Sequence, residues 1–266
     1  MQIQQAAVAA TTISYSRVST WLRCPRRYRF RYVDQAEEER TSAALILGSA
    51  IHEAVEVFFN GLKSGNPPVE DEVFAAFDLA FTDSANLAEE LGAPVDWGKS
   101  SFDEQADKGT EMLRVFLADV DRDIEVIGVE QSFEFELAPG LNVAGVIDLI
   151  LRDSDRIRVV DVKTSASSYG QDKLLYDLQP TVYMLAAERM FNAPAKVDFE
   201  YWVLTKSKQP ALKIHPVVRA EADRLELVEA FQEVRAADAS GVFPRIRGWQ
   251  CATCEHRDRC GKGACP

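Results

Sequence analysis

The spacing of hydrophobic residues changes near residue 123, from an interval typical of helices to one typical of strands. Ahead of this point, segments 16–33 and 43–63 carry apolar residues every three or four positions, which predicts two amphipathic helices. Residues 69–122 predict two or more further helices, separated by Gly92-Ala93-Pro94. The N-terminal part of the chain is therefore expected to be mainly helical.

Beyond this point apolar residues alternate with polar ones. Segments 124–137, 141–151 and 156–163 are rich in Val, Ile and Phe, and turn residues at Pro139-Gly140 and Asp153-Ser154-Asp155 separate them. Three consecutive strands with short turns predict an antiparallel meander. The elements expected after it are a helix over 172–192, strands near 197–205 and 211–218, and a helix over 220–240.

The chain contains neither an internal repeat nor a low-complexity linker, so we expect one α/β domain with a helical insertion. The predicted divisions are a flexible tail at 1–15 and a single domain over 16–266, with the helical insert at about 66–122, the core at about 123–240, and cysteine-bearing segments at 16–33 and 241–266.

At 266 residues and 47% hydrophobic composition, the chain can bury a sizeable core. No apolar run approaches the roughly 20 residues that cross a bilayer, and the N-terminus lacks the pattern of a signal peptide. An odd number of cysteines, five, fits a reducing compartment better than a disulfide framework. We therefore expect a cytoplasmic protein without a membrane partner.

The cysteines have an uneven distribution. Cys24 stands alone, whereas Cys251, Cys254 and Cys260 have the spacing C-x2-C-x5-C. A group of three with a distant fourth suggests a cluster or metal site that joins the two ends of the domain. Zinc suits four thiolates equally well, so the spacing leaves the occupant open. Cys265 is a spare thiol near the trio, which leaves the fourth ligand open as well.

The net charge of −12 and the pI of about 4.8 argue, as totals, against a nucleic-acid binder. Basic residues nevertheless crowd around both groups of cysteines. If the cysteines share a site, these segments form one positive patch, and otherwise they are two solvated basic faces. The residues concerned are Arg17, Arg23, Arg26, Arg27, Arg29 and Arg31 near the N-terminus, and Arg245, Arg247, Arg257, Arg259 and Lys262 near the C-terminus.

Two predicted strands carry carboxylates inside apolar runs. Asp148 lies in GVIDLIL, and Asp161 lies in RVVDVKTS with Lys163 on the same strand face. A hairpin with a loop from Asp153 to Arg156 pairs Arg152 with Ile157 and places Asp148 opposite Asp161. Two carboxylates and a lysine would suit a hard divalent cation and a phosphate group. The alternative is an Asp-Lys ion pair on an exposed strand face, with Asp148 at the surface.

Two helical pairs accompany these strands. His52 and Glu56 are four residues apart and share a helix face, as do Gln179 and Tyr183. Either pair alone is commonly structural.

Together these motifs resemble a known family. The order Gly48 and His52, Gly145 and Asp148, Asp161 and Lys163, then Gln179 and Tyr183, enclosed by the cysteines, resembles RecB-type nucleases of the PD-(D/E)XK superfamily. Their iron-sulfur branch includes CRISPR-associated RecB-like nucleases, phage-encoded relatives and the AddB nuclease domain. The resemblance extends from about Cys24 to Cys260 and implies a restriction-endonuclease-like core, a mixed central sheet flanked by helices.

The resemblance implies a metal site and a cluster. His52, Asp148 and Asp161 would ligate Mg²⁺ or Mn²⁺, with the backbone carbonyl of Val162, and Glu130 is a candidate for a further acidic ligand. Asp161 stands where many relatives carry glutamate, which is an allowed variant. The four cysteines implied to hold one [4Fe-4S] cluster, as a clasp between the chain ends, are Cys24, Cys251, Cys254 and Cys260.

Other roles follow from the same resemblance. Lys163 would position or activate water, and Gln179 and Tyr183 would lie beside the DNA backbone or the lysine. The arginines expected to bind DNA are Arg23, Arg26, Arg27, Arg245 and Arg247.

The implied activity is that of a metal-dependent DNA exonuclease acting on single-stranded ends or overhangs. The setting would be recombination or repair, phage DNA metabolism or CRISPR adaptation, with proteins of those processes as partners, in a bacterial, archaeal or phage-infected cell. Ring-forming relatives make an oligomer an option. The alternative is a catalytically weak nucleic-acid-binding or assembly subunit with a structural iron-sulfur or zinc site.

Overall fold

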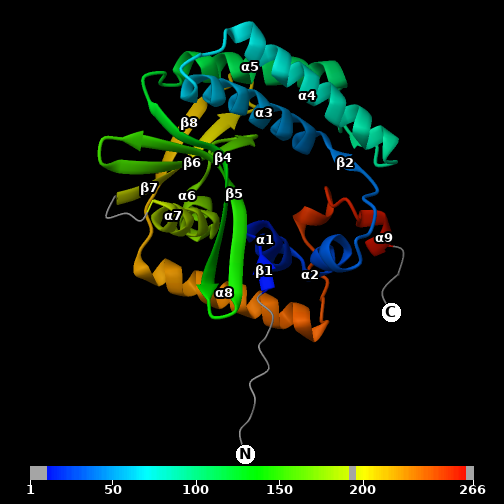
Figure 1. Cartoon of the computed structure of the whole chain (residues 1–266). Helices are drawn as coiled ribbons and strands as arrows, with labels where there is room; N and C mark the ends of the chain where they lie inside the picture. The colour runs from blue at the N-terminus through cyan, green and yellow to red at the C-terminus, as the bar shows by residue number, and fades with distance from the viewer. Residues whose placement is uncertain (1–10, 192–195, 262–266) are drawn as a thin grey trace, which may run out of the picture.

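A twisted mixed sheet lies between two layers of helices in the computed structural model, which describes residues 11–191 and 196–261 (Figure 1). Its strands are β1 (Thr11–Ile13), β4 (Glu125–Ala138), β5 (Leu141–Asp153), β6 (Arg156–Ser165), β7 (Lys196–Thr205) and β8 (Leu212–Val217). Two short strands, β2 (Thr41–Ser42) and β3 (Val95–Asp96), form a separate parallel pair. The predicted α/β class with a mixed central sheet is confirmed.

The sheet order is β1-β5-β6-β7-β8, with β4 on the other side of β5. β4, β5 and β6 pair antiparallel, so the predicted meander is confirmed, and Arg152 pairs with Ile157 as expected. The hairpin loop is shorter than predicted, because Asp153 and Arg156, which were expected in the loop, pair with each other in the ladder. β6 and β7 run parallel, since a helical connection returns the chain to the same end of the sheet.

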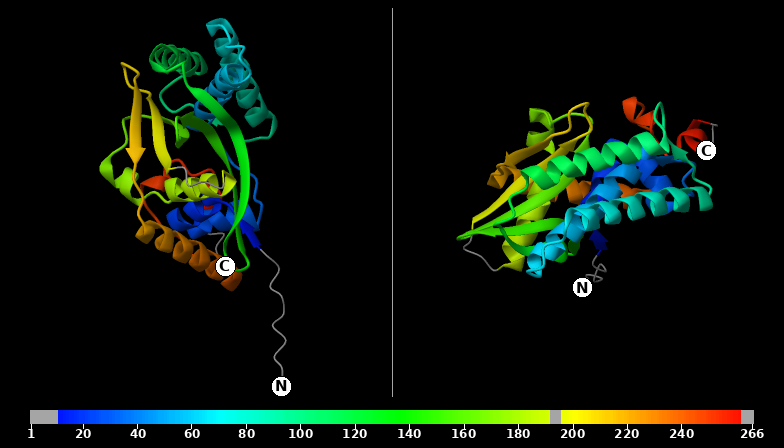
Figure 2. Two further views of the ribbon diagram at one scale, coloured as in Figure 1. Left: turned by 60° about the vertical axis from the view of Figure 1, so that its left-hand side comes forward. Right: turned by 90° about the horizontal axis from the view of Figure 1, so that it is seen from above.

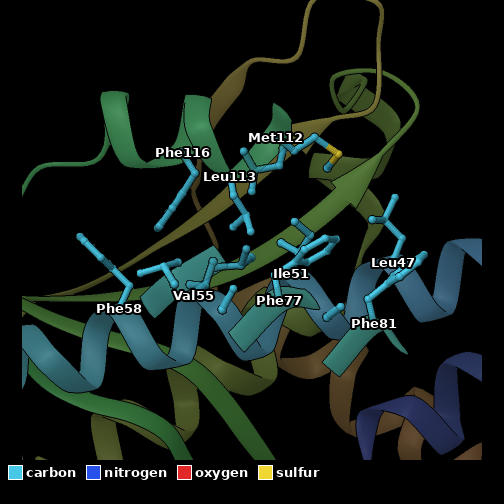
Figure 3. Packing of buried hydrophobic residues seen from close by; sticks show 14 of the residues in the cluster. Leu47, Ile51, Val55, Phe58, Phe77, Phe81, Met112, Leu113 and Phe116 are labelled. Atoms are coloured by element: carbon cyan, nitrogen blue, oxygen red, sulfur yellow. The ribbon is translucent and has the colours of Figure 1, made fainter. Parts of the chain in front are cut away.

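One helical layer contains α3 (Ala43–Lys63), α4 (Glu70–Glu90) and α5 (Phe102–Asp119). Their apolar faces meet over the sheet, as Figure 3 shows for Ile51, Phe77 and Met112, one from each helix. By length and composition alone α3 could cross a membrane. Its apolar residues pack in this core instead, which accounts for its composition.

The other sheet face is covered by α7 (Gln179–Met190), α8 (Glu221–Ser240) and α1 (Tyr15–Arg23) (Figures 1 and 2). Val18, Val182 and Phe231 are fully buried there. The candidate site therefore lies on a sheet held from both faces.

The helix predicted over 16–33 is wrong in one respect, because it is broken at Cys24. α1 ends there, α2 (Pro25–Tyr28) follows, and Arg29–Val33 continues as a π-helix. Cys24 is extended, with φ of −163° and ψ of 104°, since proline disfavours helical geometry in the residue before it. The break turns Cys24 out of a regular helix and leaves it buried.

The helix predicted over 172–192 is also broken, into α6 (Gln171–Tyr176) and α7. Pro180 is at the start of α7, where its missing N–H costs nothing, and a continuous helix would have placed it in the interior. Asp177 is extended at the break.

The tail predicted over residues 1–15 is too long. β1 pairs parallel with β5, matching Thr11 with Leu141, and α1 already begins at Tyr15 with Ser14 as its N-cap. Residues 1–10 lie outside the described part of the chain.

Candidate active site and cysteine cavity

The site forms where β5 and β6 separate. Their ladder ends at the pair Leu149 and Val160, one position before Asp148 and Asp161 would face each other. The Asp148 carboxylate bridges the gap instead, because its Oδ2 accepts a hydrogen bond from the backbone N–H of Val162 at 2.8 Å. We call this separation of β5 and β6, beyond Leu149 and Val160, the strand fork. Backbone groups and the Asp148 carboxylate are close together there.

β4 is irregular at the same level. Glu130 has a φ of 43°, rare for a non-glycine residue, and lies between the pairs Val129–Leu149 and Gln131–Ile147, opposite Asp148. Strained backbone of this kind costs about 1–3 kcal/mol and is concentrated at functional sites. The irregularity turns the Glu130 side chain toward the fork.

Three ligand groups gather at the fork. Ligand atoms of His52, Glu130 and Asp148 all lie within 4.8 Å of one another, and His52 Nδ1 is 3.6 Å from Asp148 Oδ2. α3 supplies His52, β4 supplies Glu130 and β5 supplies Asp148. One imidazole and two carboxylates form a donor set that fits Mg²⁺ or Mn²⁺.

The second predicted aspartate takes a different position. Asp161 is fully buried, and Lys163 Nζ lies 2.7 Å from its Oδ1 and 2.6 Å from its Oδ2. The side-chain amide of Gln179 also donates to Asp161 Oδ1, at 2.8 Å. Asp161 is therefore beside the metal-ligand group, held by a cation and an amide.

Gln179 and Tyr183 are 7% and 9% exposed, so they lie within the protein beside the Asp161–Lys163 pair. The ring of Tyr183 packs edge-on against Phe133 at 5.7 Å. Of the two locations predicted for them, the structure gives the one beside the lysine.

The charges of the site alter its proton affinities. Burial, together with Asp148 and Glu56, raises the pKa of Glu130 to about 7. Burial also lowers the pKa of His52 against the opposing effect of Asp148, which favours the neutral imidazole that can ligate a metal. Although burial opposes it, the carboxylates of Asp161 and Asp148 raise the pKa of Lys163, so the lysine is protonated.

These groups open onto a groove of about 470 Å³ between α3 and the sheet. Its lining includes Glu53 and Thr164, which the sequence did not point to, and Glu56, which was predicted to share a helix face with His52. Glu56 lies one helical turn after His52, so its place in the groove agrees with that prediction. The groove wall is thus more acidic than the predicted residues alone indicate.

The four predicted cysteines line a second cavity, of about 440 Å³. Cys24 reaches it from the break after α1, and the C-terminal three come from the 3-10 helix η2 (Trp249–Cys251), the following turn and α9 (Arg257–Gly261). Sequence positions more than 200 apart therefore meet in one cavity. Four thiols around one cavity fit either an iron-sulfur cluster or zinc. Cys265 and Lys262 lie outside the described residues.

Contacts between protein groups already join the two chain ends here. Arg27 pairs with Glu255 at 2.9 Å, and Arg26 donates through Nε to the Phe243 carbonyl at 3.0 Å. Within the C-terminal segment, the Arg245 guanidinium donates to the Cys260 carbonyl at 2.7 Å.

The DNA-binding prediction therefore needs correction for three arginines. Arg26 and Arg27 bind protein acceptors on the other chain end, and Arg245 binds the Cys260 carbonyl within the C-terminal segment. Arg23 and Arg247 are exposed, and within residues 11–191 and 196–261 neither forms an ion pair. For these two arginines, contact with a phosphate backbone stays a prediction.

Comparison with known proteins agrees with this geometry. The profile described as the PD-(D/E)XK nuclease superfamily matches residues 12–261. The chain therefore belongs to the PD-(D/E)XK nuclease superfamily. Members of this superfamily generally use Mg²⁺ or Mn²⁺, in keeping with the group at His52, Glu130 and Asp148.

Solved structures share the fold. A "Putative exonuclease" from Eubacterium rectale has a TM-score of 0.57 and 15% identity, over 93% of this chain and 87% of that one. A second structure, SSO0001, has a TM-score of 0.40 and 17% identity, over 98% of this chain and 89% of that one. The first likeness concerns the fold alone, and the second is too distant to support an argument. No curated protein matches the chain.

Proposed function

We propose that the protein is a metal-dependent DNA exonuclease that acts on single-stranded ends or overhangs. The observation that carries the proposal is the meeting of His52, Glu130 and Asp148 at the strand fork, with Lys163 lining the same groove. An assembly subunit with vestigial cleavage would have no need for a complete set of donors and a lysine in one groove.

His52, Glu130 and Asp148 would hold the cation, and Asp161 and the Val162 carbonyl are the further ligands that the family resemblance implies. A divalent cation bound there would polarise the scissile phosphate and lower the pKa of an attacking water.

The chain's own residues would perform the other steps. Lys163 is cationic, so its ammonium can orient the water and offset negative charge developing on the phosphate. Asp161 holds that ammonium by contacts at 2.7 and 2.6 Å, and the Gln179 amide in turn donates to Asp161 at 2.8 Å. The expected products are a 5′-phosphate and a 3′-hydroxyl.

A [4Fe-4S] cluster in the cysteine cavity is the second part of the proposal. It is supported by the four cysteines around one cavity of about 440 Å³ and by the family pattern of C-x2-C-x5-C with a distant cysteine. The cluster would be structural, joining the ends that carry Arg23 and Arg247. Such a nuclease would serve recombination, repair, phage DNA metabolism or CRISPR adaptation.

The test is anaerobic purification followed by a visible absorption spectrum and a cleavage assay. End-labelled single strands, duplexes with overhangs and closed circular single strands are incubated with Mg²⁺ or Mn²⁺. We expect a brown protein that degrades linear strands and leaves the circles intact. A colourless protein with stoichiometric zinc contradicts the cluster, and cleavage of circles at the linear rate contradicts exonuclease action.

A further inference from the structure

Asp177, at the break between α6 and α7, is the most densely bonded carboxylate of the described chain outside the metal-ligand group. Its Oδ1 accepts hydrogen bonds from the Tyr15 hydroxyl and, at 3.1 Å, from the backbone N–H of Gln179. Its Oδ2 accepts from Lys173 Nζ and, at 2.9 Å, from the Tyr201 hydroxyl. Four elements thus converge on one side chain that is 8% exposed.

The carboxylate is ionised at neutral pH. Burial alone would raise its pKa, but the ion pair with Lys173 and the hydrogen bonds from Tyr15 and Gln179 hold the pKa of Asp177 below its ordinary value. A charged, four-fold bonded group fixes the backbone that it contacts. The guanidinium of Arg219 adds to this by donating to the Asp177 carbonyl at 2.7 Å.

The residue fixed in this way contacts the active site. Gln179 is the first residue of α7, and Asp177 binds its backbone N–H while its side-chain amide donates to Asp161 Oδ1 at 2.8 Å. Asp161 in turn pairs with Lys163. Asp177 is therefore two contacts away from Asp161 and three from the lysine, and it lines neither the groove nor the metal-ligand group.

We propose that Asp177 is a positioning residue of the active site: by holding the start of α7 it keeps the Gln179 amide on Asp161, and so fixes the direction of the Asp161 carboxylate. The inference deepens the proposed nuclease function and rests on it. It gives a reason for the break before Gln179, since a continuous helix would leave this backbone N–H bonded within the helix.

The hydroxyl of Tyr15 extends the arrangement toward the chain ends. Tyr15 is the first residue of α1 and Cys24 is the residue that ends it, so one short helix runs from Asp177 to the cysteine cavity. Loss of the Tyr15 contact should therefore affect Asp161 in the same direction as loss of Asp177, by less.

The test is a double-mutant cycle with Asp177→Asn and Gln179→Ala, read as kcat and KM on a single strand and as Mn²⁺ affinity by titration calorimetry. We expect Asp177→Asn to lower kcat and Mn²⁺ affinity about tenfold with KM for DNA unchanged, as for other residues that orient a metal ligand. In the Gln179→Ala background the same change should add less than about twofold, because Asp177 acts through Gln179.

Glu188→Gln is the matched control. Glu188 lies on the same helix and pairs with Arg224 at 2.7 Å, in an ion pair that involves neither Arg219 nor Asp161. Its loss should lower the unfolding temperature and leave kcat unchanged. A purely structural role for Asp177 predicts the same behaviour for both variants.

Equal effects of Asp177→Asn in both backgrounds overturn the inference. If Asp177→Asn does not fold, Tyr15→Phe takes its place under the same criterion, with an expected loss of about threefold from one hydrogen bond. If the wild type cleaves no DNA, the proposed function fails, and the Mn²⁺ cycle decides the inference alone.

Discussion

The groove of the candidate active site and the cysteine cavity are both assembled from distant parts of the chain, yet different contacts hold them. In the groove, polar side chains hold one another: Lys163 pairs with Asp161, and Gln179 donates to the same carboxylate. Around the cavity, arginines such as Arg27 hold the walls, while the thiols face a common space.

The difference indicates what each site needs. The groove has its side chains positioned before a cation binds, which lowers the cost of organising a reaction. The cavity has its two chain ends joined by protein contacts, and a cluster would add a further crosslink. Substitutions in the groove should therefore lower activity with little loss of stability. Substitutions of the cavity cysteines should lower both activity and stability.

The largest effect is expected from Lys163→Ala. We expect cleavage to fall by about 10²- to 10³-fold, the loss typical when a group that stabilises transition-state charge is removed. Stability should change little, because burial already raises the pKa of Asp161 to about 7 and lets it take up a proton. The assay uses end-labelled single strands with calorimetry, and Lys213→Ala, an exposed lysine on β8, is the control. Unchanged cleavage by the Lys163 variant would contradict the assignment.

Cys24→Ala tests the other side of the comparison. A crosslink that closes a loop of this length contributes about 3 kcal/mol or more, so we expect a clear fall in unfolding temperature, loss of the visible absorption and weaker DNA binding. Cys265→Ala is the matched control and should retain all three properties. Wild-type stability in Cys24→Ala would mean that the protein contacts alone join the ends.

Substitutions of Arg23 and Arg27 should separate an effect on DNA binding from an effect on folding stability. Arg27→Ala leaves Glu255, whose side chain is 8% exposed, without its cation and should cost about 1–3 kcal/mol in the free energy of unfolding. Arg23→Ala should leave stability unchanged, weaken DNA binding and reduce its salt dependence by about one counterion. Chemical denaturation and fluorescence anisotropy at several salt concentrations measure these effects. The reverse pattern would contradict the division between structural and DNA-facing arginines.

A smaller effect concerns pH. Glu130 has a pKa raised to about 7, so protonation competes with a cation at neutral pH. Mn²⁺ affinity should rise between about pH 6 and about pH 8 as Glu130 loses its proton. In Glu130→Gln the affinity should be lower and the rise smaller, with Asp161 supplying what remains. A pH dependence identical to that of the wild type would exclude Glu130 as a ligand.

Local patterns in the sequence predicted much of this fold. Alternation gave the three strands of the meander and the pairing of Arg152 with Ile157, and helical spacing gave α3 over 43–63. These features depend on short-range periodicity, which one sequence records well. Asp148 and Asp161 were found because they interrupt apolar runs, and Lys163 because it shares a strand face with Asp161. His52 was found from its place in the motif order that resembles the family.

Features that depend on tertiary contacts were missed. The breaks at Cys24 and Asp177 lie inside continuous helical patterns, where only Pro25 and Pro180 give a local signal. Two partners of Asp177, Tyr15 and Tyr201, are far from it in the sequence, so residue spacing does not predict these contacts. Arg27 was assigned to DNA because its charge is visible in the sequence and its partner Glu255 is not.

The central claim is that the fork at Asp148 is the hydrolytic centre. Its most direct test is the cleavage of an end-labelled single strand by Asp148→Asn at saturating Mg²⁺ or Mn²⁺, since this change removes one ligand charge and keeps the side-chain shape. We expect a wild-type cluster spectrum with cleavage reduced at least about 10²-fold. Wild-type cleavage by Asp148→Asn would contradict the account.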